Sequence, residues 1–127
     1  MQGMNASLPD EHATLLLDRE RIDEIRKIEH ATGRDDVLSG FVRTLERSLA
    51  GFGVAFSDHL ARGDTAAARG AAHMLKGTCH QLGAQALGDL FADIERRVKA
   101  GDFAEAKRRF DGSARLIEQS LQALKQA

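Results

Sequence analysis

The sequence has few of the residues that build turns, cross-links and sheets. Its 127 residues include one proline and one cysteine, and neither tyrosine nor tryptophan occurs. This scarcity argues against an all-β domain, which would be rich in turns and large aromatic residues. Because Cys79 has no second cysteine to pair with, no internal disulfide can form, and we expect a cytoplasmic protein.

Neither charge nor hydropathy marks a nucleic-acid-binding or membrane protein. The 18 Lys and Arg residues nearly balance the 19 Asp and Glu residues. No apolar run approaches the roughly 18 residues that cross a bilayer, and the N-terminus lacks the pattern of a signal peptide. With 43% hydrophobic and 29% charged residues, the composition predicts an ordinary globular domain, which we expect to be a monomer that binds neither nucleic acid nor membrane.

Apolar residues recur at spacings of three and four, which predicts amphipathic helices. The longest stripe begins after Asp35 or Asp36 and ends before Gly63, with Gly51 and Gly53 allowing a bend. Three further stripes occupy residues 64–83, 84–101 and 102–124. We expect three aspartates to cap helices, namely Asp18, Asp64 and Asp102, with Glu105 completing a capping-box pair. All phenylalanines fall on the stripes and are predicted to be core residues: Phe41, Phe52, Phe56, Phe91, Phe103 and Phe110.

The connections between these four stripes are short, which predicts antiparallel neighbours. An isoleucine stripe precedes them, at Ile22, Ile25 and Ile28, and residues 7–11 could start another short helix. We therefore predict an all-α fold: an antiparallel up-down four-helix bundle with one or two short extra N-terminal helices. Residues 1–14 would form a tail or short helix, and residues 15–127 the bundle domain.

Several kinds of chemistry have no support in the sequence. There is no glycine-rich phosphate loop and no GxGxxG motif after a strand, so the chain has no visible means of using ATP itself. The Glu-x-x-His pairs of di-iron bundles are missing, and the spacing of five histidines and one cysteine does not suggest a metal site. We expect no metal and no cofactor, and a metal-binding bundle stays a weaker alternative.

One histidine has unusual neighbours. His73 would lie at the edge of the apolar stripe of its helix, with Gly70 three residues before it and Gly77 four residues after it. A glycine inside a helix costs about 0.5–1 kcal/mol relative to alanine. Two of them beside one histidine indicate that local stability has been given up to keep the surface there bare.

An imidazole in such a place is suited to carrying a phosphoryl group. Its Nε2 is a good nucleophile near neutral pH, provided that the other nitrogen holds the proton and an acceptor fixes that tautomer. A cation should balance the charge of the phosphoryl oxygens, and Lys76, one turn on, supplies it. Gly70 and Gly77 leave room for the reacting partner. The acceptor would have to come from a neighbouring helix.

The segment His73-Met74-Leu75-Lys76-Gly77-Thr78, followed by Gln81-Leu82-Gly83-Ala84, resembles the histidine-containing phosphotransfer (HPt) domain of two-component phosphorelays. The resemblance extends over about residues 15–125. It implies that His73 is the phosphoacceptor, that Lys76 lies near the phosphoryl group, and that Gly77 lets a receiver domain approach. Glu95 matches a position where members carry Gln or Glu bonded to the histidine, so its carboxylate would accept the Nδ1 proton.

The surroundings of His73 leave alternatives open. Arg69, Arg96, Arg97 and Lys99 are expected to be a solvated basic face or a docking surface for an acidic receiver pocket. His80 stands where many members have a small residue, and it would narrow the choice of receiver or simply be exposed. Cys79 is expected to be a buried core residue.

By resemblance, the function is that of a phosphohistidine carrier and not of an enzyme with its own ATP site. His73 would accept a phosphoryl group from a receiver-domain phosphoaspartate and pass it to a second receiver aspartate. The partners would be response-regulator receivers and a hybrid sensor histidine kinase, with Mg²⁺ supplied by the receiver. The alternative is a helical adaptor or inhibitor that binds a kinase or a response regulator without carrying phosphate.

Overall fold

The computed structural model describes residues 16–127, and helices make up most of this range. The six helices of these residues are α2 (Arg19–Thr32), α3 (Val37–Ala61), α4 (Thr65–Leu82), α5 (Gln85–Lys99), α6 (Phe103–Asp111) and α7 (Ala114–Lys125). No strand occurs in this part of the chain, which confirms the predicted all-α class. The predicted N-terminal tail and the possible helix at residues 7–11 lie outside the described residues.

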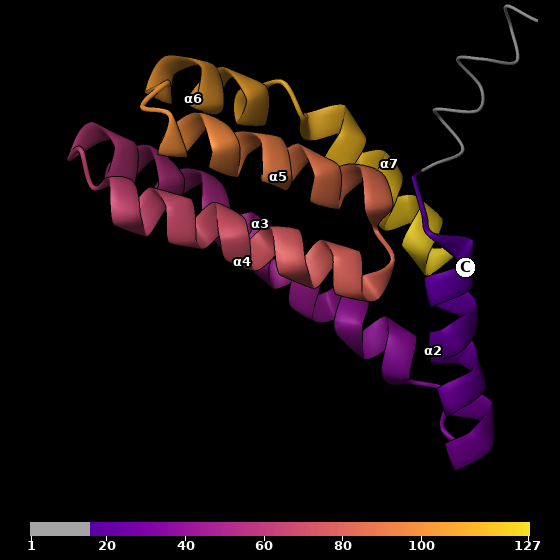
Figure 1. Ribbon diagram of the computed structural model, residues 1–127. Coiled ribbons are helices and arrows are strands. Elements are labelled where there is room, and N and C mark those ends of the chain that lie inside the picture. Colours follow the sequence, from indigo (N-terminus) through magenta and orange to yellow (C-terminus); the bar gives the residue numbers. More distant parts are fainter. Residues whose placement is uncertain (1–15) are drawn as a thin grey trace, which may run out of the picture.

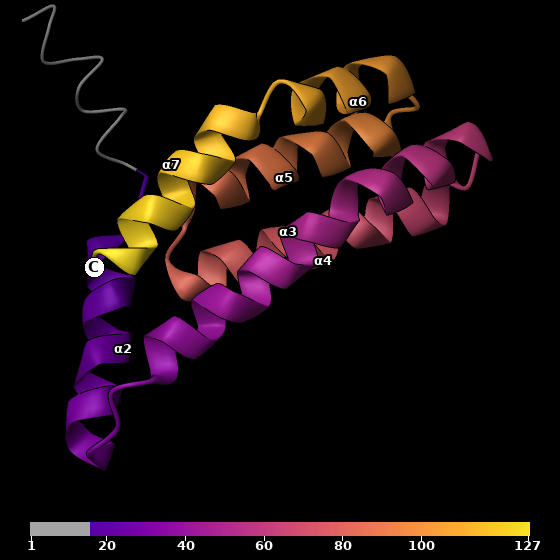
Figure 2. The same cartoon turned by 180° about the vertical axis from the view of Figure 1, so that it is seen from behind.

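The bundle has four antiparallel positions, and the fourth is occupied by two consecutive shorter helices, α6 and α7. Figure 1 shows α3, α4 and α5 side by side in alternating directions, with α6 and α7 returning along α5 as the fourth rod. Seen from behind in Figure 2, α2 lies across the end of the bundle, beside the C-terminal end of α7. There the Arg26 guanidinium donates a hydrogen bond of 2.6 Å to the carbonyl of Ala127. No helix among residues 16–127 is long and apolar enough to cross a membrane.

The helix ends follow the sequence signals closely. The carboxylates of Asp18, Asp64 and Asp102 each accept a bond from the backbone N–H three residues on, as predicted for N-caps. Gly83 ends α4 with a φ of 95°, in the left-handed region that favours glycine. The predicted capping-box pair is wrong, because the N–H of Asp102 donates to the carbonyl of Arg97 and the Glu105 carboxylate binds arginines of its own helix.

The start of α3 is capped by another helix. The helix starts directly after Asp36, as predicted, but the Asp36 carboxylate pairs with Arg34 at 3.0 Å and makes no capping bond. The Glu29 carboxylate of α2, buried with 5% exposure, accepts bonds of 3.0 Å from the N–H groups of Val37 and Leu38. The bond from Leu38, followed by that from Arg26, lowers the pKa of the Glu29 carboxyl. α2 thus supplies the cap that α3 lacks.

A second contact fastens α2 to the turn between α4 and α5. The N–H of Asp18 donates to the carbonyl of Gly83 at 2.8 Å, and the Ile22 side chain lies against Gly83. Arg21 adds a bond of 2.6 Å from its Nε to the carbonyl of Gln81. The turn that aligns α4 with α5 is therefore held by polar and apolar contacts from α2.

Four phenylalanines from α3, α5 and α6 cluster in the core, one pair stacked and the others meeting edge-on or tilted. The ring of Phe52 lies 4.8 Å from that of Phe56, 5.2 Å from that of Phe91 and 4.9 Å from that of Phe110, measured between centroids. α3 continues unbroken past the glycines where a bend was possible. Gly53 serves packing instead, since a Cβ there would come within 3.1 Å of the Phe110 ring.

Three predictions about apolar positions are wrong. Phe41 and Ile28 are 45% and 49% exposed, because each stands at the margin of a stripe whose centre faces the core. The last helix, predicted as continuous, is divided after Asp111, where the hydroxyl of Ser113 bonds the carbonyl of Phe110 and competes with the helical pattern. Ala114, which lies on the stripe of residues 102–124 and was therefore expected in the core, is consequently exposed at the start of α7.

Candidate functional site

A histidine and a carboxylate meet between α4 and α5. Nδ1 of His73 lies 2.9 Å from Oε2 of Glu95, and the side chains are 65% and 17% exposed. Since an ionised carboxylate only accepts hydrogen bonds, this contact assigns the proton to Nδ1. Nε2 of the neutral ring then carries the free lone pair on an exposed side chain.

The same carboxylate holds a cation. Nζ of Lys76 lies 2.8 Å from Oε1 of Glu95, so the two oxygens of Glu95 serve two different residues of α4. Burial raises the pKa of the Glu95 carboxyl, but the hydrogen bonds and charges of Lys76 and His73 outweigh it and leave the pKa below its usual value. Glu95 is therefore ionised at neutral pH. The sequence assigned Lys76 to the phosphoryl oxygens and gave no sign of this ion pair.

The register of α4 against α5 brings these groups together. Leu75 and Cys79 of α4 are buried, as are Ile94 and Val98 of α5, so apolar contacts fix both helices on either side of the polar residues. His73 and Lys76 lie one turn apart on α4, and the short turn at Gly83 places Glu95 opposite them. Each polar side chain thus stands at the edge of a packed interface.

The surface beside His73 is bare. A Cβ built on Gly70 or Gly77 would meet no other described atom within 4 Å. Met74, next to the histidine, is 71% exposed. The glycines are therefore not required for packing within the described part of the chain, and open space over α4 is their visible consequence.

The basic residues near the site do not form one free surface. Asp93, with a 19% exposed side chain, binds Arg96 at 2.6 Å and Arg97 at 3.1 Å, and Arg109 of α6 lies 3.6 Å away. Burial raises the pKa of the Asp93 carboxyl, but these guanidinium groups bring it below its usual value. The expectation of a simple solvated face is thus wrong for Arg97, which is half-buried. Arg69 and Lys99 are exposed.

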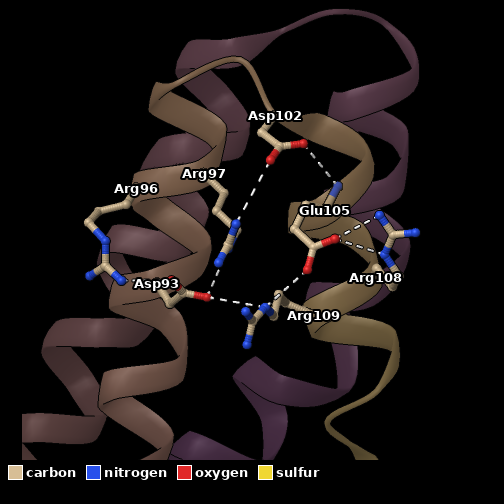
Figure 3. A network of polar contacts seen from close by, with 7 residues as sticks. All are labelled: Asp93, Arg96, Arg97, Asp102, Glu105, Arg108 and Arg109. Atoms are coloured by element: carbon tan, nitrogen blue, oxygen red, sulfur yellow. Dashed lines mark hydrogen bonds and ion pairs between the residues drawn. The ribbon is translucent and has the colours of Figure 1, made fainter.

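These contacts extend into a network that joins α5 to α6. Glu105 binds Arg108 at 2.7 Å and Arg109 at 3.2 Å, and Asp102 lies 3.8 Å from Arg97. Figure 3 shows the arginines and acids alternating across the gap between the two helices. The sequence did not reveal the two pairs that join the helices, Asp93 with Arg109 and Arg97 with Asp102, because these pairs depend on how α5 and α6 are placed against each other.

His80 also binds a carboxylate of α5. Its Nε2 lies 3.1 Å from Oδ1 of Asp89, which also accepts a 3.1 Å bond from Nε2 of Gln85. His80 is thus half-buried and paired, and not simply exposed, which was one of the two alternatives that the sequence left open.

Other reactive groups lie outside this site. Cys79 is buried as predicted, and burial raises the pKa of its thiol to about 12, so the thiolate is scarce at neutral pH. Within residues 16–127, no three His, Cys, Asp or Glu side chains gather in a way that could hold a metal ion.

Fold and site together define a class: an all-α protein that presents a carboxylate-bound histidine at the surface of a helical bundle. The family model of the Hpt domain matches residues 36–127, and the chain belongs to this family. Its general role is accordingly that of a phosphohistidine carrier in a phosphorelay. Members of this family interact with receiver domains and kinases. No curated protein and no solved structure matches the chain.

Proposed function

We propose that His73 is the residue that carries the phosphoryl group, between the phosphoaspartate of one receiver domain and the aspartate of a second. The observation that supports this most directly is the 2.9 Å contact of Nδ1 with Glu95 on a ring that is 65% exposed. In the neutral ring, this contact puts the proton on Nδ1 and leaves the lone pair of Nε2 free on an exposed side chain. Gly70 and Gly77 leave open space beside the ring for the receiver.

The transfer step balances without an added proton. The lone pair of His73 Nε2 attacks phosphorus, the N–P bond forms, and the bond from phosphorus to the aspartyl oxygen breaks as the carboxylate leaves with its electron pair. The proton on Nδ1 stays in its hydrogen bond, and the ring becomes positively charged. Glu95 stabilises this charge because it is ionised and in direct contact.

Lys76 has a second role in this scheme. In the resting site its ammonium group neutralises part of the Glu95 charge at 2.8 Å. When a phosphoryl group with about two negative charges arrives next to the ring, Lys76 is close enough to turn toward the phosphoryl oxygens. The receiver would supply Mg²⁺, and a hybrid sensor kinase in the cytoplasm would supply phosphate to the first receiver.

The experiment uses a receiver labelled with radioactive phosphate and the full 127-residue chain. Wild type and a His30→Gln control should take up label, because His30 is exposed on α2 and outside the site. His73→Gln should take up none. The label should be acid-labile and alkali-stable, as expected for phosphohistidine. Label on the His73→Gln variant would refute the assignment.

The adaptor reading makes a different prediction. An adaptor would bind the receiver or kinase with wild type and His73→Gln alike, and neither protein would become labelled. The carboxylate-bound His73 and the shared Lys76 contact favour transfer, because binding alone does not require an oriented imidazole.

A further inference from the structure

The ring of His80 is held in place by residues of α5. Three residues of that helix contribute: Asp89 accepts from the ring, Gln85 donates to the same carboxylate, and Gly88 faces the ring. A Cβ on Gly88 would overlap three ring atoms of His80, with Cγ at only 2.9 Å. The ring therefore lies directly on the α5 backbone, in a place that only glycine leaves free.

Stability does not account for this arrangement. The His80 and Asp89 side chains are 37% and 63% exposed, and ion pairs or hydrogen bonds at such a surface contribute little to the free energy of folding. A glycine within a helix is unfavourable by itself. The contacts instead fix the orientation of an aromatic ring that remains partly open to solvent.

His80 is also unlike a second phosphoacceptor. In His73 the carboxylate occupies Nδ1 and leaves Nε2 free, whereas in His80 the carboxylate occupies Nε2. Only Nδ1, next to the main chain, remains. Asp89 is paired with the neutral Gln85, while Glu95 is paired with Lys76. The fixed ring of His80 is thus better suited to contacting a bound protein than to accepting a phosphoryl group.

His80 lies close enough to His73 that a protein bound over His73 would also contact His80. The two histidines are seven residues apart on α4, so they lie on one face about 10 Å apart. A standard interface buries about 800 Å² on each partner, which corresponds to a disc of roughly 16 Å radius. A receiver centred on His73 would therefore contact His80.

We propose that His80, held by Asp89 and Gly88, is a specificity-determining contact for the receiver domain. This rests on the proposed function of His73. His80 contributes to receiver affinity and does not take part in the chemistry of transfer. Receivers with a side chain that fits the fixed ring are then preferred over those without one.

The test compares wild type with two variants that change the ring in different ways. His80→Ala removes the ring, and Gly88→Ala keeps His80 but displaces its ring from α5. His30→Ala, on exposed α2, is the matched control. Initial rates of transfer from the phosphorylated receiver that labels wild type fastest give KM and kcat, and urea unfolding gives stability.

Both variants should raise KM about tenfold, the effect of losing one good interface contact, with kcat unchanged and the unfolding midpoint not lowered. The His30→Ala control should match wild type. A KM within twofold of wild type for His80→Ala, or a fall in kcat alone, would overturn the proposal. If wild type itself accepts no label from any receiver, the proposed function fails instead, so the two failures are distinguishable.

Discussion

Glu95→Ala is the sharpest test of the site. The substitution removes the acceptor of the His73 Nδ1 proton and the partner of Lys76, at 2.9 and 2.8 Å respectively. A hydrogen bond to a charged group is worth about 1.5–3 kcal/mol. Because the His73 side chain is 65% exposed and water can replace part of the interaction, we expect the lower half of that range. Transfer to His73 should slow about 10- to 50-fold.

Glu95→Gln separates charge from hydrogen bonding. The amide oxygen can still accept from Nδ1, but a neutral hydrogen bond has about half the strength of a charge-assisted one. We therefore expect a smaller loss, about three- to tenfold. Glu24→Ala is a suitable control, since Glu24 is an exposed carboxylate on α2 that pairs with Arg21.

Rapid-quench measurements of label moving from receiver to carrier give the rate, and the decay of purified phosphoprotein gives the lifetime of phosphohistidine. Lys76→Met and the double variant complete a mutant cycle, because Glu95→Ala also releases Lys76. If Glu95→Ala leaves both rate and lifetime equal to those of wild type, the orienting role of Glu95 is wrong. The carrier function of His73 would survive that result.

Three further predictions concern stability and reactivity. Ser120→Ala should raise the free energy of unfolding in urea by about 1 kcal/mol, because the fully buried hydroxyl has no hydrogen-bond partner among the described residues and alanine favours the helix; an unchanged or lower value would contradict this. Cys79 should resist thiol reagents at pH 8 in the folded protein and react at once in denaturant, since burial raises its pKa to about 12; fast labelling of the native protein would contradict it. The pKa values of Asp93 and Glu95 are lowered in the folded state, so their contribution to stability is complete above the unfolded carboxyl pKa of about 4. It should be lost as the pH falls through the lower folded values, and denaturant midpoints measured from pH 6 to pH 2 should show a smaller decline for Asp93→Asn than for wild type.

The fold was largely predictable because its signals are local. Apolar spacing defines the face of each helix, and aspartate and glycine define most ends, as Asp64 and Gly83 do for α4. The division between α6 and α7 escaped prediction, since Gly112 and Ser113 interrupt an apolar stripe that otherwise continues. The Ser113 hydroxyl bonds the carbonyl of Phe110 at the division between the two helices, and the spacing of apolar residues does not reveal such a bond.

The candidate site was predictable only in part. His73, Lys76 and the two glycines stand in one segment, and the resemblance to a family pointed to Glu95. The partners of His80 and the arginine that α6 brings to Asp93 were missed, because helix periodicity gives the face of a residue but not the residue opposite it on another helix. The capping of α3 by Glu29 was missed for the same reason, since Glu29 is a buried carboxylate on a helix whose buried face was assigned to isoleucines.

The contacts of α2 bear on where this folding unit begins. The family match starts at residue 36, immediately before α3, whereas the groups that cap α3 and hold the α4–α5 turn come from Glu29 and Asp18. A fragment cut at residue 36 would keep His73, Lys76 and Glu95 but leave the first N–H groups of α3 without their carboxylate. Its α4–α5 turn, which sets the distance between the histidine and its acceptor, would lose an anchor. The smallest piece that preserves the site therefore extends upstream to include α2, beyond the residues by which the family is recognised.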